Sequence, residues 1–340
     1  MTHSQPASSS ADSANNQLRI TNLTGQCSMQ DLGRNHAQHL GYCASGAADE
    51  FAFRWANKLL HNEQNAAALE LIFAHIELVI KGNIELVSTG APSEILLNGK
   101  AVKQWQVISV GDGDKLRIAA PKNGLISYLA VKGGFERNRF LASCSQSINE
   151  RHLENAEATP KAGDMLTVNS PSQLESSVAS ASCNNTNTAA IAINKQRNIS
   201  FQRFYQNSPL ILRFIASELF LALPENAQRA LLQGYKISAT SNRMGYRLEG
   251  TAFIPQQIEQ HKATLSRPVC FGTIQLPPDG QPIVLMKDRQ TIGGYPVLGT
   301  VIQTDLFRLS QKRPGETVQF LPVSLAQAQA QLHSFLERFS

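Results

Sequence analysis

Short apolar runs separated by turn-forming residues dominate the chain and predict a mainly β protein. In the first half the strand-like runs are Ile76–Ile80, Ile84–Ser88, Glu94–Leu97, Val107–Val110, Lys115–Ala119 and Ile126–Val131. Turn signals such as Lys81-Gly82-Asn83 and Gly111-Asp112-Gly113 separate these runs. A spacing of roughly 8–12 residues between such runs is typical of antiparallel barrels and sandwiches.

The second half repeats this pattern and contains the most informative segment, Gly280–Gly294. Its predicted strands are Tyr235–Ala239, Arg247–Leu248, Thr273–Leu276, Ile283–Met286 and Thr317–Leu321. The run that ends at Met286 leads directly into Lys287-Asp288-Arg289-Gln290 and then into Gly293-Gly294. A strand end holds side chains in fixed directions, and glycines let the backbone come close to a ligand. The segment therefore predicts a functional role.

A first helix is predicted over Ala48–His61, whose apolar residues recur on one side. Asp49 and Glu50 stand in its first turn, and Lys58 and His61 stand in its last. This charge distribution complements the dipole of a helix.

Two further helical segments are predicted in the second half. Pro209–Leu232 is apolar with helical spacing and is interrupted at Pro224. Near the C-terminus, Ser324 and Gln327 form a capping-box pattern before a run that ends near Arg338.

Composition divides the chain into two ordered parts. Residues 1–17 are polar and predict a disordered tail, and 18–168 form the first domain. In 169–190, twelve of twenty-two residues are Ser, Thr or Asn, which predicts a Ser/Asn-rich linker over 169–197. Residues 198–340 form the second domain, which includes the C-terminal helix.

Charge and cysteine content exclude several classes of protein. The net charge of +5 is spread along the chain without a Lys/Arg block, which disfavours nucleic-acid binding. The five cysteines include no C-x-x-C pair, so neither a disulfide framework nor a zinc knuckle is indicated. The N-terminus lacks the pattern of a signal peptide, and no apolar run approaches the roughly 20 residues that span a bilayer. We therefore expect a soluble, cytoplasmic protein without a membrane partner.

Several polar residues in the first half allow two interpretations. Asp31 and Arg34 can orient an anionic substrate, or they can form an Asx-type turn closed by a local ion pair. The segment Ser45–Asp49 can offer free backbone N–H groups to an anion, or it can simply cap the helix that follows. Glu70 is either a buried carboxylate with a raised pKa or an exposed residue of an alternating strand.

Two other clusters favour a structural interpretation. Ser143-Cys144-Ser145 has no neighbouring base, which favours a packed cysteine over a nucleophile. His36 and His39 have H-x-x-H spacing, but no third ligand is identified and no metal site is predicted. Neither glycine-rich phosphate-binding pattern occurs, so nucleotide binding by such a loop is not expected.

The strongest polar set lies in the second half, where Arg243 and Arg247 stand four residues apart around a glycine. Guanidinium groups suit the recognition of carboxylates and phosphates. Asp288 can orient Arg289 or accept a proton. Surface ion pairs are the alternative explanation for these charges.

Six segments resemble one known family: SNRMGYRL (241–248), GTIQLPPDGQPIVLMKDRQTIGGYP (272–296), QDLGR (30–34), SGAADEFAFRWAN (45–57), ALE (68–70) and YLAVKGGF (128–135). They are similar to the biotin-dependent carboxyltransferase / allophanate hydrolase subunit 2 family. The resemblance covers nearly all of 18–325 apart from the linker. It implies a mainly β fold of two tandem cyclophilin-like β-barrel subdomains with a few short helices.

The resemblance also implies partners and a reaction. The chain would be the C subunit of an ATP-dependent 5-oxoprolinase-type complex that opens 5-oxoproline to glutamate. It would act with a B subunit, of the allophanate hydrolase subunit 1 family, and with an A subunit homologue. ATP would be used at the level of the complex, and the substrate would be a small amide or lactam. Biotin enters only if the chain is instead a urea or amide carboxyltransferase component.

The resemblance assigns roles to residues of this chain. The catalytic set would be Asp288, Arg289 and Gln290. The substrate-binding set would be Arg243, Arg247, Asp31, Arg34, Asp49, Gln275, Gly293, Gly294 and Tyr295.

Some positions depart from the family's pattern. The family's Gly-Ala-Met-Asp is Gly46-Ala47-Ala48-Asp49 here, and its Gly-Ser-Arg-Ser-Thr is Ala142-Ser143-Cys144-Ser145-Gln146. The segments Glu150–Ala158 and Arg213–Glu218 lack glycines that the family carries there. These losses motivate another hypothesis, a non-catalytic paralogue that binds a B-type or kinase-inhibitor-like partner. The urea-type alternative is weaker, since no biotin-carrier or biotin-carboxylase segment is recognised in the chain.

Overall fold

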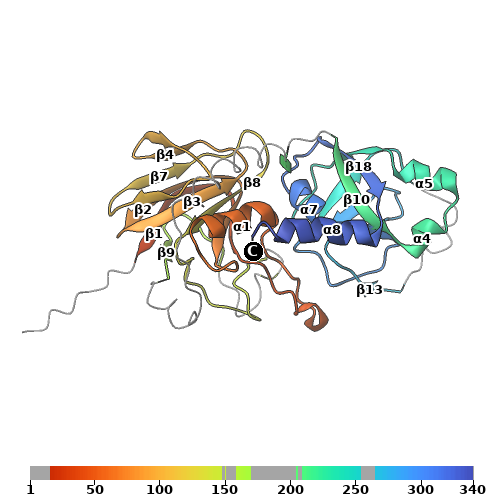
Figure 1. The fold of residues 1–340 in the computed structure, drawn as a ribbon, viewed down its shortest axis with the longest axis horizontal. Coiled ribbons are helices and arrows are strands. Elements are labelled where there is room, and N and C mark those ends of the chain that lie inside the picture. The colour runs from red at the N-terminus through yellow and green to blue at the C-terminus, as the bar shows by residue number, and fades with distance from the viewer. Residues whose placement is uncertain are drawn as a thin grey trace, which may run out of the picture.

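The computed structural model describes residues 16–147, 150, 158–169, 204–205, 209–253 and 265–339. Two β-rich halves lie side by side along the long axis of the molecule, with helices between them (Figure 1). The expected tail and linker lie mostly outside the described residues. Gln17, which we expected in the tail, already belongs to the first strand.

The first half is a nine-stranded sheet that wraps partly around its own core. Its strands are β1 Gln17–Gln30, β2 Ala68–Lys81, β3 Ile84–Gly90, β4 Ile95–Leu97, β5 Lys100–Val102, β6 Ile108–Val110, β7 Lys115–Ile118, β8 Ile126–Val131 and β9 Met165–Thr167. On one edge β2 pairs with β1 along its length. On its other edge it pairs first with β8 and then with β7, so the sheet splits into two branches around one apolar core.

The sheet splits where the β1–β2 ribbon bends, at Gly25 and Phe73. The register shifts between Thr24 and Gln26, and Phe73 adopts a positive φ of 47°. Gly25 has a φ of +82°, and a Cβ atom there would lie 2.4 Å from the carbonyl oxygen of Phe73. Only glycine fits this conformation and this close approach without strain.

The second half forms a closed barrel in the order β10-β17-β14-β15-β12-β11-β18. The strands of this half are β10 Leu210–Ala216, β11 Gly234–Ile237, β12 Gly245–Glu249, β13 Arg267–Pro268, β14 Thr273–Gln275, β15 Ile283–Leu285, β16 Ile292–Gly293, β17 Val297–Val301 and β18 Thr317–Pro322. The parallel pair β10–β18 completes the barrel, and β13 and β16 form a separate two-stranded sheet. The predicted mainly β fold with two barrel-type subdomains is confirmed, as a half barrel followed by a closed one.

Helices are short and few among the described residues. They are α1 Glu50–Leu59, α4 Glu218–Leu221, α5 Glu225–Leu231, α7 Gln303–Leu309 and α8 Leu325–Leu336, with a 3-10 turn at Gln38–Leu40. The predicted first helix is confirmed, although His61 lies beyond its end with a positive φ. The capping box of Ser324 and Gln327 is present at the start of α8. No helix within the described ranges is both long and apolar enough to cross a membrane.

The helix predicted over Pro209–Leu232 is wrong in its first part. Leu210–Ala216 is strand β10, in which Leu210, Leu212 and Phe214 are fully buried and alternate with less buried neighbours. This period of two marks a strand with one face in the barrel core. The expected break is confirmed, because Pro224 separates α4 from α5.

An aromatic cluster joins the two halves. Phe51 of α1 stacks on Phe204 with ring centroids 4.2 Å apart, and it also contacts Phe335 of α8. Phe307 of α7 packs against Phe335 in turn. Figure 1 shows α8 crossing the second half and reaching toward α1 at the centre of the molecule. The contact between the halves is therefore a buried apolar core, which fixes their relative position.

The bend at Gly25 can be tested against a second left-handed glycine. Gly25→Ala should lower the free energy of unfolding by about 2–4 kcal/mol, because strain and a backbone clash add together. Gly99 has a φ of +79°, but a Cβ atom added there would meet nothing within 4 Å. Gly99→Ala should therefore cost only the backbone strain, about 1–2 kcal/mol. Urea denaturation followed by tryptophan fluorescence measures both, and equal losses would contradict the proposed bend.

Candidate functional site

The central feature of the site is a forked ion pair between Arg243 and Asp288. Arg243 lies just before β12, and Asp288 follows β15. The guanidinium donates from Nε to Oδ2 of Asp288 at 3.0 Å and from Nη2 to Oδ1 at 2.8 Å. The backbone N–H of Asp288 donates to the carbonyl of Arg243 at 2.8 Å, which ties the two segments together. Such a two-point pair fixes both side chains in direction.

Glu70 of β2 brings the first half into the same cluster. Its carboxylate is fully buried and accepts hydrogen bonds from Nη1 of Arg243, from the hydroxyl of Tyr128 at 2.6 Å and from the N–H of Ala48 at 2.9 Å. Of the two interpretations of Glu70, the buried carboxylate is correct. The Ala48 amide, at the segment that opens α1, binds this internal carboxylate.

Backbone contacts close the junction around Arg243. Its Nη2 donates to the carbonyl of Gly46 at 2.9 Å, and the N–H of Ser45 donates to the carbonyl of Lys287 at 3.1 Å. Burial by itself would lower the pKa of Arg243, but the carboxylates of Asp288 and Glu70 outweigh it and raise the pKa. The guanidinium is therefore permanently charged.

A second ion pair supports the first across the junction. Nζ of Lys287 lies 2.8 Å from Oε1 of Glu50 and stands over the ring of Phe271. Glu50 also pairs with Arg54 of the same helix. Burial would raise the pKa of Glu50, but these two cations lower it below its ordinary value. The ammonium group of Lys287, in the second half, therefore pairs with the ionised carboxylate of Glu50, in the first half.

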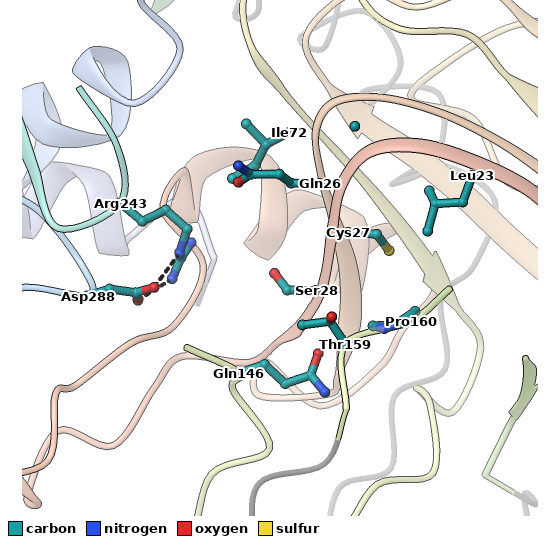
Figure 2. Close-up of a pocket in the computed structure, with 11 residues that line it drawn as sticks. Leu23, Gln26, Cys27, Ser28, Ile72, Gln146, Thr159, Pro160, Arg243 and Asp288 are labelled. Carbon is teal, nitrogen blue, oxygen red and sulfur yellow. Dashed lines mark hydrogen bonds and ion pairs between the residues drawn. The ribbon is translucent and has the colours of Figure 1, made fainter. Parts of the chain in front are cut away.

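The Arg243–Asp288 pair lines a pocket of about 120 Å³. Figure 2 shows the pair on one side of this pocket and residues of β1 on the other. The remaining lining residues are Leu23, Gly25, Gln26, Cys27, Ser28, Ile72, Gln146, Thr159 and Pro160. The pocket therefore combines an apolar wall with hydroxyl and amide groups and with one ion pair.

This set of groups suits an amide. An amide or lactam carries an N–H donor next to a carbonyl acceptor, and the pocket presents a carboxylate beside a guanidinium. Among the described residues, no group of three His, Cys, Asp or Glu side chains is arranged to hold a metal ion.

Asp31 and Arg34 lie in the first half, outside the lining of this pocket. The Asp31 carboxylate accepts hydrogen bonds from the hydroxyls of Ser143 and Ser145, both at 2.6 Å, and from the N–H of Gly33 at 2.8 Å. Burial would raise its pKa, but these hydrogen bonds lower it. The Asx-type turn is therefore present, while Arg34 pairs with Glu150 at 3.1 Å.

Ser143-Cys144-Ser145 serves to hold Asp31. Besides the two hydroxyls, the N–H of Cys144 donates to Oδ2 of Asp31 at 2.9 Å. Cys144 is buried, and burial raises the pKa of its thiol. The packed-cysteine interpretation therefore fits the structure, because a thiol held in its neutral form is a poor nucleophile.

Asp49 caps α1 and receives groups from the second half. Its Oδ1 accepts from the N–H of Ala52, and its Oδ2 accepts from the hydroxyl of Tyr205 and from Nε2 of Gln311 at 2.7 Å. Burial raises the pKa of Asp49 to about 6. Its N–H donates to the hydroxyl of Tyr128, which links it indirectly to Glu70.

Four other residues of the predicted set lie in the second half, outside the lining of this pocket: Arg289, Gln290, Gln275 and Gly293. Arg289 is buried and donates to the carbonyl of Val269 and to Oε1 of Gln38, both at 3.4 Å. Gln290 donates to Gln275 at 3.3 Å, and Gly293 lies against the Gln275 amide.

The remaining members of the predicted set, Gly294, Tyr295 and Arg247, are exposed to solvent. Gly294 follows β16, and Tyr295 is 46% exposed. The side chain of Arg247 is exposed on the outer face of β12. Of the whole predicted set, Arg243 and Asp288 line the pocket.

Sequence reasoning missed several groups of the site. Tyr128 lies in β8, whose six residues are all buried, and it is the hydroxyl that joins Glu70 to Asp49. A tyrosine in a strand whose other residues are apolar except for Ser127 is a usable signal, since a buried hydroxyl needs a polar partner. Ser28 carried no comparable signal, and Gln146 was noted only as part of the segment Ala142–Gln146 that departs from the family's pattern.

Comparison with known proteins gives the family. Residues 40–322 match the family described as carboxyltransferase domain, subdomain A and B. The chain belongs to this carboxyltransferase-domain family.

Individual relatives agree with this assignment. The chain is 32% identical to the C subunit of 5-oxoprolinase from Haemophilus influenzae over 312 residues, which are 92% of this chain and 93% of that protein. It is 30% identical to the 5-oxoprolinase C subunit of Escherichia coli over the same shares. The crystal structure of the Kluyveromyces lactis urea carboxylase has the same fold, with a TM-score of 0.80 and 22% identity over 97% of this chain and 29% of that one.

The raised pKa of Asp49 predicts a dependence of stability on pH. Because the folded pKa of about 6 exceeds the unfolded value of 3.8, the folded state binds the proton more tightly. The stabilisation of the folded state by this proton is fully present below pH 4 and is lost as the pH rises to about 6. It amounts to at most about 3 kcal/mol of unfolding free energy.

Asp49→Asn removes this group and isolates its share of the pH dependence. The difference in unfolding free energy between native protein and variant should change steadily between pH 4 and 6 and stay constant above about 7. Urea denaturation at a series of pH values measures it. A difference that does not vary with pH would show that Asp49 does not titrate as described.

Proposed function

We propose that this chain is the carboxyltransferase-type component of an ATP-dependent complex that opens 5-oxoproline to glutamate. In this proposal it binds the lactam in the pocket between β1 and the Arg243–Asp288 pair. Family membership and the identity of 30–32% to two 5-oxoprolinase C subunits support the reaction class.

One observation carries the assignment of the pocket. Charged groups from both halves converge there: Arg243 and Asp288 line it, and Glu70 binds Arg243 from the far side. Charges buried at a junction often stabilise it no more than apolar side chains of similar size would, so their presence there supports a role in recognition. A pocket of about 120 Å³ suits a small substrate.

The roles follow from the chemistry of each group. Asp288 accepts the lactam N–H, and Arg243 binds the carbonyl oxygen and stabilises the charge that develops on it during attack. Ser28 offers a further hydroxyl to the substrate carboxylate or to water. The nucleotide would be handled by the A and B subunits of the complex, since this chain carries neither common phosphate-binding loop.

The test uses the chain co-purified with homologues of the A and B subunits and measures 5-oxoproline-dependent ATP hydrolysis. Asp288→Asn and Arg243→Lys should each lower kcat/KM by about 100-fold or more, because a directed charge or a two-point fork is lost. The proposal does not include Arg247, whose side chain is exposed on the same sequence motif. Arg247→Ala should therefore retain activity, and circular dichroism should show all three variants folded.

The outcomes separate the alternatives. Full activity in Asp288→Asn would remove the pocket from the mechanism. A stable complex without 5-oxoproline-dependent ATP hydrolysis would favour the non-catalytic paralogue that only binds a B-type partner. Turnover of urea with biotin-linked carboxyl transfer would favour the carboxyltransferase alternative.

A further inference from the structure

A second cavity, of about 190 Å³, lies in the second half and shares no lining residue with the first pocket. It is formed where β10, α7 and α8 meet the segment at 204–205. Its lining residues are Phe204, Arg213, Thr304, Arg308, Gln331, Ser334, Phe335 and Arg338. Three of these residues are arginines, so the charge of the cavity decides what can bind there.

Positive charge exceeds negative charge in this cavity. Arg213 forms a fork with Asp305, from Nε at 2.8 Å and from Nη2 at 2.6 Å. Arg308 approaches the same carboxylate at 3.5 Å, and Asp305 is fully buried. Arg338 forms no ion pair within the described part of the chain. Three guanidinium groups thus face one carboxylate, which leaves a net charge of about +2.

Arg308 shares its carboxylate partner, Asp305, with Arg213. Burial lowers the pKa of Arg308, and the Asp305 carboxylate only partly offsets this effect. Nε of Arg308 donates to the carbonyl of Phe204 at 2.7 Å, which holds the side chain at the cavity wall. A bound anion would supply the negative charge that Asp305 shares between two arginines.

A buried hydroxyl in the wall gives independent evidence of a ligand. Thr304 is only 7% exposed, lines the cavity and has no hydrogen-bond partner for its Oγ1 among the described residues. Leaving a buried hydroxyl without a partner costs about 1–3 kcal/mol. An acceptor oxygen in the cavity would satisfy it.

From these observations we propose that the cavity binds a phosphate-type oxyanion, either free phosphate or the phosphoryl end of a larger ligand. The net charge of about +2 matches the two negative charges of the hydrogen phosphate dianion. Planar guanidinium groups and one hydroxyl donor match an anion with several acceptor oxygens. The cavity is smaller than the roughly 300–1,000 Å³ of sites that enclose drug-sized ligands, so it holds the anionic group rather than a whole nucleotide. This site is independent of the activity proposed above.

Titration of the full chain with inorganic phosphate at constant ionic strength, followed by calorimetry and by phosphorus NMR, tests the site. Native protein should bind one phosphate saturably. Thr304→Val removes the hydroxyl at nearly constant volume, and Arg338→Ala removes an exposed guanidinium without touching Asp305. Each should weaken binding by about 5- to 10-fold. Arg229→Ala is the matched control, since Arg229 is an exposed arginine of α5 paired with Glu225, and it should leave the Kd unchanged.

A competition experiment separates the sources of the phosphate. ADP that displaces inorganic phosphate would support a site for a nucleotide phosphoryl group. Binding of inorganic phosphate that ADP leaves unaffected would support a site for the free ion.

Three results would overturn the proposal. They are no saturable phosphate binding, equal affinity in native protein and both cavity variants, and tighter binding of glutamate than of phosphate. The last result would assign the cavity to carboxylates instead.

Discussion

The guanidinium of Arg243, shared between a carboxylate of each half, is the interaction on which the junction and its pocket depend. It binds Asp288 within the second half and Glu70 across the junction. Removing one partner of a buried pair leaves an uncompensated charge at a cost of about 3–5 kcal/mol. Glu70 in turn fixes Tyr128 and the first amides of α1. The geometry of the pocket therefore requires that both halves are folded and in contact.

Apolar and polar contacts have different roles at this junction. The aromatic cluster around Phe51 supplies buried area and holds the halves together. The ion pairs add direction, because a forked pair tolerates little displacement of either partner. A purely apolar junction would hold the halves as firmly, yet it would leave no charged groups to face a small polar ligand. Arg243, Glu70 and Asp288 are such charged groups, and two of them, Arg243 and Asp288, line the pocket at the junction.

The sequence predicted the strands better than the directions of the side chains. Runs such as Ile126–Val131 were recognised because apolar runs bounded by turns have few other interpretations. The helix predicted over Pro209–Leu232 is wrong at its start, since the apolar residues of Leu210–Ala216 suit the period of a strand as well as that of a helix. Arg243 and Arg247 stand in one sequence motif, but β12 begins between them and the alternation of the strand turns Arg247 to solvent. Only the packing of the two halves shows that Glu70 faces Arg243.

The neighbouring residues Phe204 and Tyr205 have a consequence for communication within the molecule. Phe204 lines the arginine-rich cavity and stacks on Phe51, while the hydroxyl of Tyr205 donates to Asp49. A ligand that shifts this dipeptide therefore changes the contact of α1 with the second half. By thermodynamic reciprocity, if binding in the cavity shifts the equilibrium of that contact by some factor, forming the contact shifts the affinity of the cavity by the same factor. Phe204 and Tyr205 thus connect the arginine-rich cavity to the start of α1 through direct side-chain contacts.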